Sequence, residues 1–429
     1  MDFKAHLPKN LKKEQIDALF ASFGEEQTHS LVLNAAKMSD EEFRARFPLA
    51  VPHPFLGHVY SYKREDYEFG KMALYDLGCY SIQDSAAMLP PYVLNPQKGE
   101  RVLDLCAAPG GKTIFLSLLS NQEALVLSND ISLSRAKELS SNVERMGLGN
   151  VIVSNDDFEE KQAYYEGFFD AIMLDVPCSG TAMMRKNAQA KQEWSPSKME
   201  RCVAMQLALL EQAYAMLKPG GRMVYSTCSF CYEEDEGVLS SFLTRHSDMR
   251  AKSVRDRPCY FHGETIPEAI YLFPSLYPGE GQFLCLLEKE GERAIDKAEG
   301  RKARQYADYY SFFGLDERAY YEGEEGLWSL PFGFPFENLN VLRVGVKVSS
   351  SPFEEPDNAL SHFLGKEFQV ELSEPDALRF LKGETLPLKL SDGFYLASYQ
   401  GKGLGFFKMA KGQMKNRYPK GLRRSYKLI

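Results

Sequence analysis

The sequence predicts an α/β fold: a parallel sheet between helices, with a small domain before it and a β-rich module after it. The chain has 429 residues, which is enough for two to four domains. Residues 75–287 alternate short apolar runs with helical patterns, which is the rhythm of βαβ units. Residues 356–429 contain short β-like runs between glycine turns, and this pattern favours a small β domain.

Changes in composition along the chain predict four segments. An N-terminal domain covers residues 1–74, where a helical pattern gives way to proline-broken extended chain, and the α/β domain covers 75–290. The charge-dense run 288–304 predicts a linker or an exposed helix. An intermediate segment, 300–350, precedes a turn-rich stretch, and the β-rich module covers 356–429.

Composition excludes several classes of protein. With 44% hydrophobic and 26% charged residues, the chain is typical of soluble globular proteins. Its apolar runs are far shorter than a membrane span, and no signal peptide opens it, so we expect a cytoplasmic protein with no membrane partner. Eight cysteines with a single CxxC pair, and no HExxH, predict neither a disulfide framework nor a metal site. A monomer is the expectation.

The net charge of −8 is unevenly distributed. Residues 401–429 hold nine Lys or Arg and no Asp or Glu, so the rest of the chain carries −17. An acidic body with a basic end indicates one module that binds a polyanion. A solvated basic C-terminus is the alternative.

The central domain shows five predicted strands with functional residues at their ends. They cover residues 101–108, 124–130, 150–157, 169–175 and 221–229. The first runs into a Pro-Gly-Gly turn and a helix that starts at Lys112, which lets backbone N–H groups approach a ligand. Asp130, Asp157 and Asp175 end the next three strands, where the first can accept hydrogen bonds from ribose hydroxyls.

Two kinds of ligand are candidates for the loop after the first strand. The loop lacks GxGxxG but nearly matches a P-loop, with Gly111-Lys112-Thr113 in place and Cys106 where the first glycine belongs. A P-loop would leave Asp130 and the cysteines of the later strands without a role. A loop of this kind, followed by acidic strand ends, favours an adenosine ligand without polyphosphate, and S-adenosylmethionine fits. Asp130 would bind its ribose and Asp157 its adenine edge.

Cys178 and Cys228 each follow the end of a predicted strand. If the fourth and fifth strands are neighbours, both thiols lie at the carboxyl edge of the sheet, where such folds bind ligands. A thiolate that adds to C6 of a pyrimidine makes C5 nucleophilic enough to accept a methyl group. The alternative is a pair of small buried residues, but the flanking Pro-Cys-Ser-Gly and Ser-Thr-Cys-Ser are polar turns.

Four motifs in this order resemble one enzyme family. GCYSIQDSAAMLP (78–90), VLDLCAAPGGKT (102–113), LDVPCSGT (174–181) and YSTCS (225–229) are similar to those of the Sun-type RNA cytosine-5 methyltransferases. The C-terminal portion, from KEFQVEL to the basic end of the chain, resembles the PUA-like tail of the RsmF type, which methylates cytosine in small-subunit ribosomal RNA. The resemblance therefore implies a Rossmann-like methyltransferase domain with a PUA-like RNA-binding module.

The resemblance also implies roles for individual residues. Cys228 would be the nucleophile, Cys178 would assist product release, and Asp175 would hydrogen-bond the cytosine. The cofactor S-adenosylmethionine would contact Cys106, Ala107, Ala108, Pro109, Gly110, Gly111, Lys112, Asp130, Asp157 and Asp175. Asp156 is adjacent to the family's acidic position, so the choice of Asp157 depends on a gapless alignment.

The substrate implied by the resemblance is 16S ribosomal RNA, free or within the 30S subunit. A tRNA methyltransferase and a non-catalytic RNA-binding assembly factor are the alternatives, and the presence of both cysteines argues against the second. In the C-terminal module, Phe406 and Phe407 either stack RNA bases or belong to the core, which we favour. Arg185 and Lys186 follow the Cys178 loop and are candidates for phosphate contacts.

Overall fold

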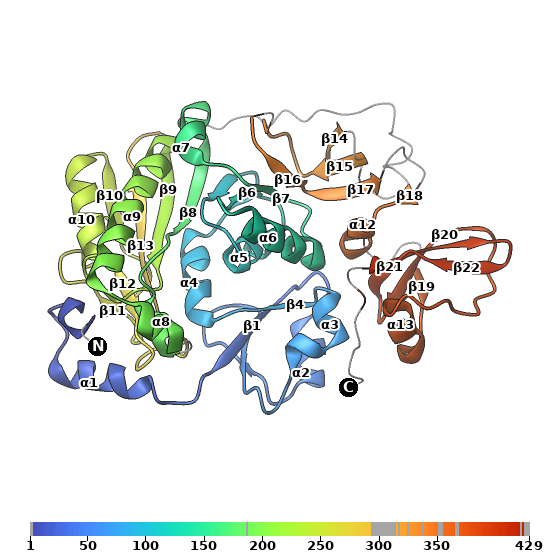
Figure 1. The fold of residues 1–429 in the computed structure, drawn as a ribbon, viewed down its shortest axis with the longest axis horizontal. Helices are drawn as coiled ribbons and strands as arrows, with labels where there is room; N and C mark the ends of the chain where they lie inside the picture. Colours follow the sequence, from blue (N-terminus) through green and yellow to red (C-terminus); the bar gives the residue numbers. More distant parts are fainter. Residues whose placement is uncertain are drawn as a thin grey trace.

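The structure, a computed structural model, describes residues 3–185, 188–292, 315, 318–323, 326–336, 338–350, 355–364, 369–420 and 423. A ten-stranded sheet lies at its centre, with three four-stranded sheets around it. In Figure 1 the N-terminal sheet lies below the central sheet and the C-terminal strands lie to its right.

Five parallel strands form the middle of the central sheet. They are β5 (Arg101–Asp104), β6 (Leu125–Asn129), β7 (Val151–Ser154), β8 (Phe169–Asp175) and β9 (Leu217–Thr227). Their order is β9-β8-β5-β6-β7, so the direction in which strands are added reverses beside β5. Ligands of open α/β sheets bind outside the carboxyl ends of the strands at such a reversal. All five strands predicted from the sequence are confirmed.

Antiparallel strands extend this sheet at both edges. Next to β9 come β13 (Gln282–Lys289), β12 (Ile270–Leu272) and β11 (Phe261–His262), and β10 (Met249–Lys252) also pairs with β13. At the other edge β16 (Val341–Val344) pairs with β7. The segment that the sequence suggested as an intermediate region therefore contributes one strand to the central sheet.

Helices cover both faces of the central sheet, because both faces are apolar. Leu125 and Leu127 of β6 pack on one side and Val126 packs on the other. The Val126 face carries α4 (Ser85–Leu94), α5 (Gly111–Leu119) and α6 (Leu133–Met146). The opposite face carries α9 (Pro196–Met216) and α10 (Glu236–Arg245), and the short helices α7 (Phe158–Lys161) and α8 (Ala188–Glu193) lie in connections.

Polar side chains cap the helices where the sequence places suitable residues. Ser195 accepts a hydrogen bond from the N–H of Lys198, and Pro196 occupies the first turn of α9, where its missing N–H costs nothing. Asp84 accepts from the N–H groups of Ala86 and Ala87 at the start of α4. These caps satisfy backbone donors that have no partner within the helix.

The N-terminal region forms an antiparallel sheet and two packing helices. Its strands are β1 (His29–Leu33), β2 (Val51–Pro52), β3 (Val59–Tyr62) and β4 (Tyr80–Ile82), in the order β2-β3-β1-β4. Helices α2 (Asp40–Arg46) and α3 (Ala73–Asp76) pack on this sheet. The predicted first helix is α1 (Lys13–Ser22), and its Leu19 joins the core on the α9 side of the central sheet.

The C-terminal part contains two small β sheets. The first comprises β14 (Ala319–Gly323), β15 (Gly326–Leu330), β17 (Val346–Ser350) and β18 (Glu355–Pro356), followed by α12 (Asn358–Phe363). The second comprises β19 (Gln369–Glu371), β20 (Gly393–Tyr399), β21 (Lys402–Ala410) and β22 (Gln413–Asn416), with α13 (Glu374–Leu381). The expected β-rich end is confirmed, and Phe406 and Phe407 are core residues.

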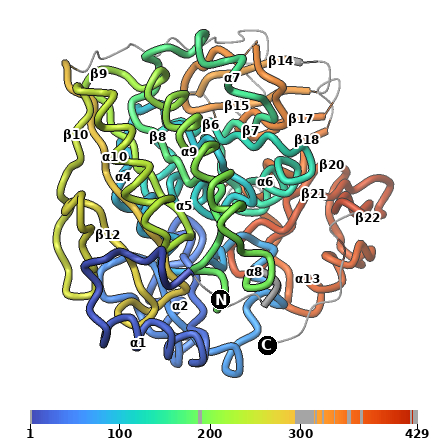
Figure 2. Tube along the Cα trace, turned by 60° about the vertical axis from the view of Figure 1, so that its left-hand side comes forward, coloured from blue at the N-terminus to red at the C-terminus, as the bar shows by residue number. Residues whose placement is uncertain are grey.

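The second C-terminal sheet shares a hydrophobic core with the N-terminal sheet. Leu31 and Phe43 belong to the same buried cluster as Phe380 and Phe407. The ammonium group of Lys402, which is almost fully buried, lies 2.7 Å from a carboxylate oxygen of Glu42. Figures 1 and 2 both show the red C-terminal strands beside the blue N-terminal ones. The N-terminal sheet and the second C-terminal sheet are therefore packed together.

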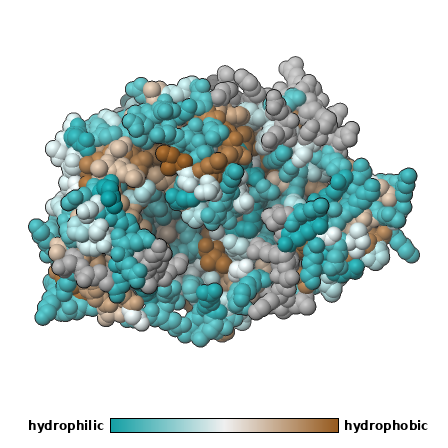
Figure 3. All heavy atoms as spheres, in the orientation of Figure 1, coloured by the Kyte–Doolittle hydropathy of each residue, from teal (hydrophilic) through white to brown (hydrophobic). Residues whose placement is uncertain are grey.

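None of the helices in the described part of the chain has the length and apolar character of a membrane span. Figure 3 shows hydrophilic residues over most of the face it displays, with apolar residues in several separate groups.

Replacement of Asp170 by Ala should lower the free energy of unfolding by about 3–5 kcal/mol, because it removes a carboxylate that pairs with the buried ammonium group of Lys218 at 2.9 Å. Asp170 also accepts the N–H of Arg101. Urea unfolding measures the change. The control is Glu123→Ala, which breaks an exposed ion pair with Lys98 and should cost under about 1 kcal/mol. Equal effects of the two substitutions would contradict this account.

Candidate active site

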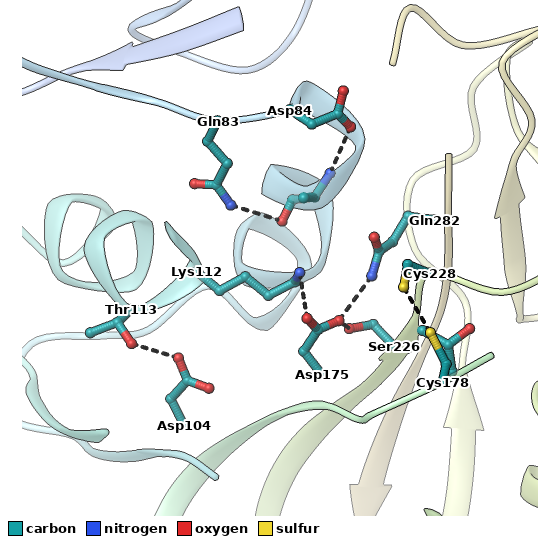
Figure 4. A network of polar contacts seen from close by, with 12 residues as sticks. Gln83, Asp84, Asp104, Lys112, Thr113, Asp175, Cys178, Ser226, Cys228 and Gln282 are labelled. Atoms are coloured by element: carbon teal, nitrogen blue, oxygen red, sulfur yellow. Dashed lines mark hydrogen bonds and ion pairs between the residues drawn. The ribbon is translucent and has the colours of Figure 1, made fainter. Parts of the chain in front are cut away.

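The parallel pairing of β8 and β9 brings the two cysteines together. Asp175 at the end of β8 is in register with Ser226 of β9. Cys178 and Cys228 follow within three residues, and their Sγ atoms lie 2.7 Å apart. Both are free thiols and are partly buried. Figure 4 shows the two sulfur atoms facing each other, close to Asp175.

Three side chains orient the carboxylate of Asp175. Lys112 Nζ lies 2.7 Å from one oxygen, while Ser226 Oγ and Gln282 Nε2 donate to the other at 2.7 and 2.9 Å. The three donors come from α5, β9 and β13, and Figure 4 shows them converging on Asp175. The sequence singled out Asp175 and Lys112 but gave no role to Ser226, although it lies in the YSTCS motif. It also missed Gln282, which belongs to no motif and reaches the site only through strand pairing.

The loop of residues 106–112 borders a cavity of about 260 Å³, which Asp175 and Gln83 also line. The φ angle of Gly110 is +109°, a conformation that favours glycine. A Cβ atom on Gly111 would lie 2.8 Å from the amide group of Gln83, so any other residue there would displace that side chain. The predicted glycine turn thus borders a pocket at the start of α5, where backbone N–H groups are available to a ligand.

The other two predicted carboxylates lie at the ends of neighbouring strands. Asp130, buried after β6, accepts the N–H of Ser132 and forms an ion pair with Arg135. Asp157, after β7, is exposed and caps α7. Its neighbour Asp156 is buried, and both of its carboxylate oxygens accept the N–H of Asn340. Asp157 is therefore the one of the pair whose carboxylate is accessible.

Asp104, at the end of β5, is a buried acid that sequence reasoning did not select. Burial raises its pKa to about 7, although a hydrogen bond from Thr113 Oγ1 opposes the shift. Among the described residues its Oδ1 has no hydrogen-bond partner, and the same holds for Oε1 of Gln83. Gln83 lines the cavity, so its free acceptor suits a polar ligand such as S-adenosylmethionine.

The surroundings of Cys178 and Cys106 favour the protonated form of each thiol. The pKa of Cys178 is raised well above its usual value, first by its hydrogen bond with Cys228 and then by burial. Burial also raises the pKa of Cys106 far above its usual value. Cys178 is therefore a neutral thiol in contact with Cys228, and Cys106 behaves as a packed residue of the loop.

Two basic residues beyond Cys178 were candidates for phosphate contacts. The guanidinium group of Arg185 donates to the carbonyl oxygens of Glu26 and Gly279, so it ties the N-terminal region to the late strands. Lys186 lies outside the described residues. Within the described ranges, no group of three or more His, Cys, Asp or Glu side chains could hold a metal ion.

Comparison with known families identifies the two main parts of the chain. Residues 91–288 match a family described as 16S rRNA methyltransferase RsmB/F, and residues 367–424 match one described as methyltransferase RsmF PUA domain. The chain belongs to the RsmB/F methyltransferase family. This RsmB/F methyltransferase is an enzyme that uses S-adenosylmethionine, with a Rossmann-like domain and a PUA domain.

Individual relatives of the RsmB/F methyltransferase cover most of its length. It is similar to the ribosomal RNA small subunit methyltransferase F of Shewanella loihica, with 29% identity over 80% of this chain and 78% of the relative. The protein of the same name from Shewanella baltica is 28% identical over 97% of this chain and 94% of its own. Among solved structures, a methyltransferase homolog from Pyrococcus horikoshii is 27% identical, with a TM-score of 0.58 over 65% of this chain and 92% of that one.

Replacement of Asp104 by Asn should remove one pH dependence of stability. The folded protein retains this proton up to about pH 7, whereas an unfolded chain loses it near the usual value of 3.8. The folded state therefore binds more protons between these values, and its stability falls as pH rises, by about 1.4 kcal/mol per pH unit. The free energies of unfolding of both proteins are measured without ligand from pH 5 to 8. The wild-type protein should lose stability relative to the variant as the pH rises to 7. A constant difference would contradict the raised pKa.

Proposed function

We propose that this RsmB/F methyltransferase forms 5-methylcytosine in 16S ribosomal RNA through a covalent bond between Cys228 and C6 of the target base. The observation that carries this proposal is the contact of the two Sγ atoms beside Asp175, at the carboxyl ends of β8 and β9. The family description and the names of the relatives, which both refer to small-subunit ribosomal RNA, support the choice of RNA.

The chemistry requires a nucleophile because C5 of cytosine is too weak to take a methyl group directly. Addition of the Cys228 sulfur to C6 forms a C–S bond and makes C5 enamine-like. After C5 is methylated it loses its proton, the C6–S bond breaks, and the thiol of Cys228 is restored. Cys178, a neutral thiol at 2.7 Å, is placed to assist this elimination. Asp175 would hydrogen-bond the base and favour protonation at N3.

The residues around the cavity fit the cofactor. Residues 106–112 would hold S-adenosylmethionine together with Asp130, Asp157 and Asp175, which line or flank the strand ends. The cofactor supplies an electrophilic methyl group. Lys112 pairs with Asp175 and would keep its carboxylate oriented while the base enters.

RNA binding would use several parts of the protein. A base inside a duplex cannot reach the thiols, so the target must be unpaired or flipped. The PUA domain exposes Lys411, in the turn between β21 and β22, and Lys415, on β22, where they can contact phosphates. We propose that residues 1–74 position the RNA, 75–290 catalyse, 300–350 connect and 356–429 bind RNA. A cytoplasmic monomer that acts on free 16S RNA or the 30S subunit is part of the proposal.

Transfer of labelled methyl groups tests this function. Deproteinised ribosomal RNA, 30S particles and tRNA are incubated with the protein, and bisulfite sequencing then locates the methylated base. We expect 5-methylcytosine in 16S RNA only. Label in tRNA alone would show that tRNA, and not ribosomal RNA, is the substrate. A complete lack of transfer to these RNAs would contradict the enzymatic proposal.

The two cysteines should have different phenotypes. Cys228→Ala should abolish methyl transfer because it removes the nucleophile. Cys178→Ala should leave a protein–RNA adduct that survives denaturation, because elimination is impaired. Denaturing electrophoresis with labelled RNA detects the adduct, and Cys79→Ala, at a buried cysteine outside the site, serves as the control. An adduct with Cys228→Ala and none with Cys178→Ala would reverse the roles.

The double substitution Lys411→Ala/Lys415→Ala should weaken RNA binding without changing kcat. Each lysine that neutralises a phosphate contributes about 0.7–0.9 to the slope of log affinity against log salt. The variant should therefore show a slope smaller by about 1–2 and a higher KM for RNA. Lys98→Ala, at an exposed residue outside the PUA domain, is the control. An unchanged salt slope would exclude these lysines from the RNA contact.

A further inference from the structure

A buried carboxylate, Glu234, lies beneath the two cysteine loops. It follows β9 in the segment between Cys228 and α10, and its side chain is fully buried. Its Oε1 accepts the backbone N–H of Ser179 at 2.7 Å and the amide of Gln206 at 3.3 Å. Its Oε2 accepts the hydroxyl groups of Ser179 and Ser229 at 2.5 and 2.6 Å.

The donors to Glu234 belong to both thiol-bearing loops. Ser179 directly follows Cys178, and Ser229 directly follows Cys228. Gln206 of α9 also donates to the carbonyl oxygen of Pro177, which directly precedes Cys178. One carboxylate therefore ties the residues next to each thiol to a single point.

We propose that Glu234 is a positioning residue that holds the sulfur atoms of Cys178 and Cys228 in contact for the covalent reaction. This inference rests on the proposed function of the two thiols and adds a residue that contacts neither base nor cofactor. The backbone bonds between the loops, Val176 N–H to Ser226 and Ala182 N–H to Cys228, fix the main chain but not the serine side chains. Without the carboxylate, four donors lose this acceptor, namely the N–H and hydroxyl of Ser179, the hydroxyl of Ser229 and the amide of Gln206. The loops must then shift to satisfy them.

The charge of Glu234, like its hydrogen bonds, favours contact between the two thiols. It contributes to the raised pKa of Cys178, after the hydrogen bond with Cys228 and burial. A neutral Cys178 can remain a hydrogen-bond partner of Cys228, whereas two thiolates at this distance would repel each other.

Glu236 provides a matched control two residues away. Its side chain is equally buried, and its carboxylate accepts the N–H groups of Glu264, Thr265 and Ile266. It also accepts the hydroxyl groups of Thr265 and Tyr271. It thus anchors the segment before β12 rather than the cysteine loops. Glu234→Gln and Glu236→Gln each replace a fully hydrogen-bonded buried carboxylate, so both should reduce stability, but the first alone should separate the thiols.

Phenylarsine oxide tests the thiol contact without any catalytic step. The reagent binds two neighbouring thiols, forming two As–S bonds and releasing water. Native mass spectrometry of the full-length protein should show an arsenical adduct that is lost in Cys178→Ala, which assigns it to this pair rather than to Cys228 and Cys231. In Glu234→Gln the adduct should be lost, while Glu236→Gln should retain it.

Kinetics of the same proteins give the second readout. Misplacement of a reacting group by about 1 Å can cost about 100-fold in rate. We expect kcat of Glu234→Gln to fall by about that factor, with KM for RNA nearly unchanged, and Glu236→Gln to keep its kcat. If Glu234→Gln does not fold, Ser179→Ala/Ser229→Ala removes both hydroxyl contacts to Oε2 from the donor side and should also lose the adduct and lower kcat.

Retention of the arsenical adduct or of kcat in folded Glu234→Gln, or in the double serine variant, would overturn the inference. Equal losses in Glu236→Gln would also overturn it, since they would reflect general destabilisation. The wild-type protein, assayed alongside for 5-methylcytosine, separates this inference from the proposed function: absence of the product from wild type contradicts the function whatever Glu234 does.

Discussion

The parallel pairing of β8 with β9 is the constraint on which the site depends. Neighbouring strands lie about 4.8 Å apart, so the residues that follow two paired strand ends must be close in space. Because Asp175 is in register with Ser226, the turns that carry Cys178 and Cys228 leave the sheet side by side. Both strands are buried on both faces, and slippage by one residue would move side chains such as Ile172 to the opposite face, where different residues pack. The stability of the sheet therefore sets the geometry of the thiols.

A second set of contacts converts this proximity into a fixed arrangement. Asp175 is held by donors from three elements, and Glu234 collects donors from both cysteine loops. A fully buried carboxylate such as that of Glu234 is stable only when donors surround it. The shared core of the N-terminal sheet and the PUA domain acts at a larger scale, since it fixes an RNA-binding module against the body of the enzyme. RNA bound there would contact a module that is packed against the rest of the enzyme, rather than one that is joined to it only by a linker.

The sequence predicts those features that depend on local pattern. The five central strands, the glycine turn before α5 and the position of both cysteines at strand ends follow from apolar runs and turn residues. The family motifs identify Asp175 and Lys112 as site residues. Contacts between distant segments leave no local pattern, so Gln282, which reaches Asp175 from β13, and Glu234, in an unremarkable acidic run, were missed. The pairing of β16 with β7 could not be predicted either, because nothing in the sequence of Val341–Val344 indicates which strand it pairs with. Burial, which raises the pKa of Asp104, is equally absent from the local sequence.

The central claim is that Cys228 forms the bond to the base. The most direct measurement is to digest the adduct trapped in Cys178→Ala with nuclease and protease and to sequence the nucleotide-bearing peptide by mass spectrometry. The account predicts a cytidine-derived mass on Cys228, in the peptide that spans the end of β9. A nucleotide attached to any other residue, or a methylated product formed without any covalent intermediate, would contradict it.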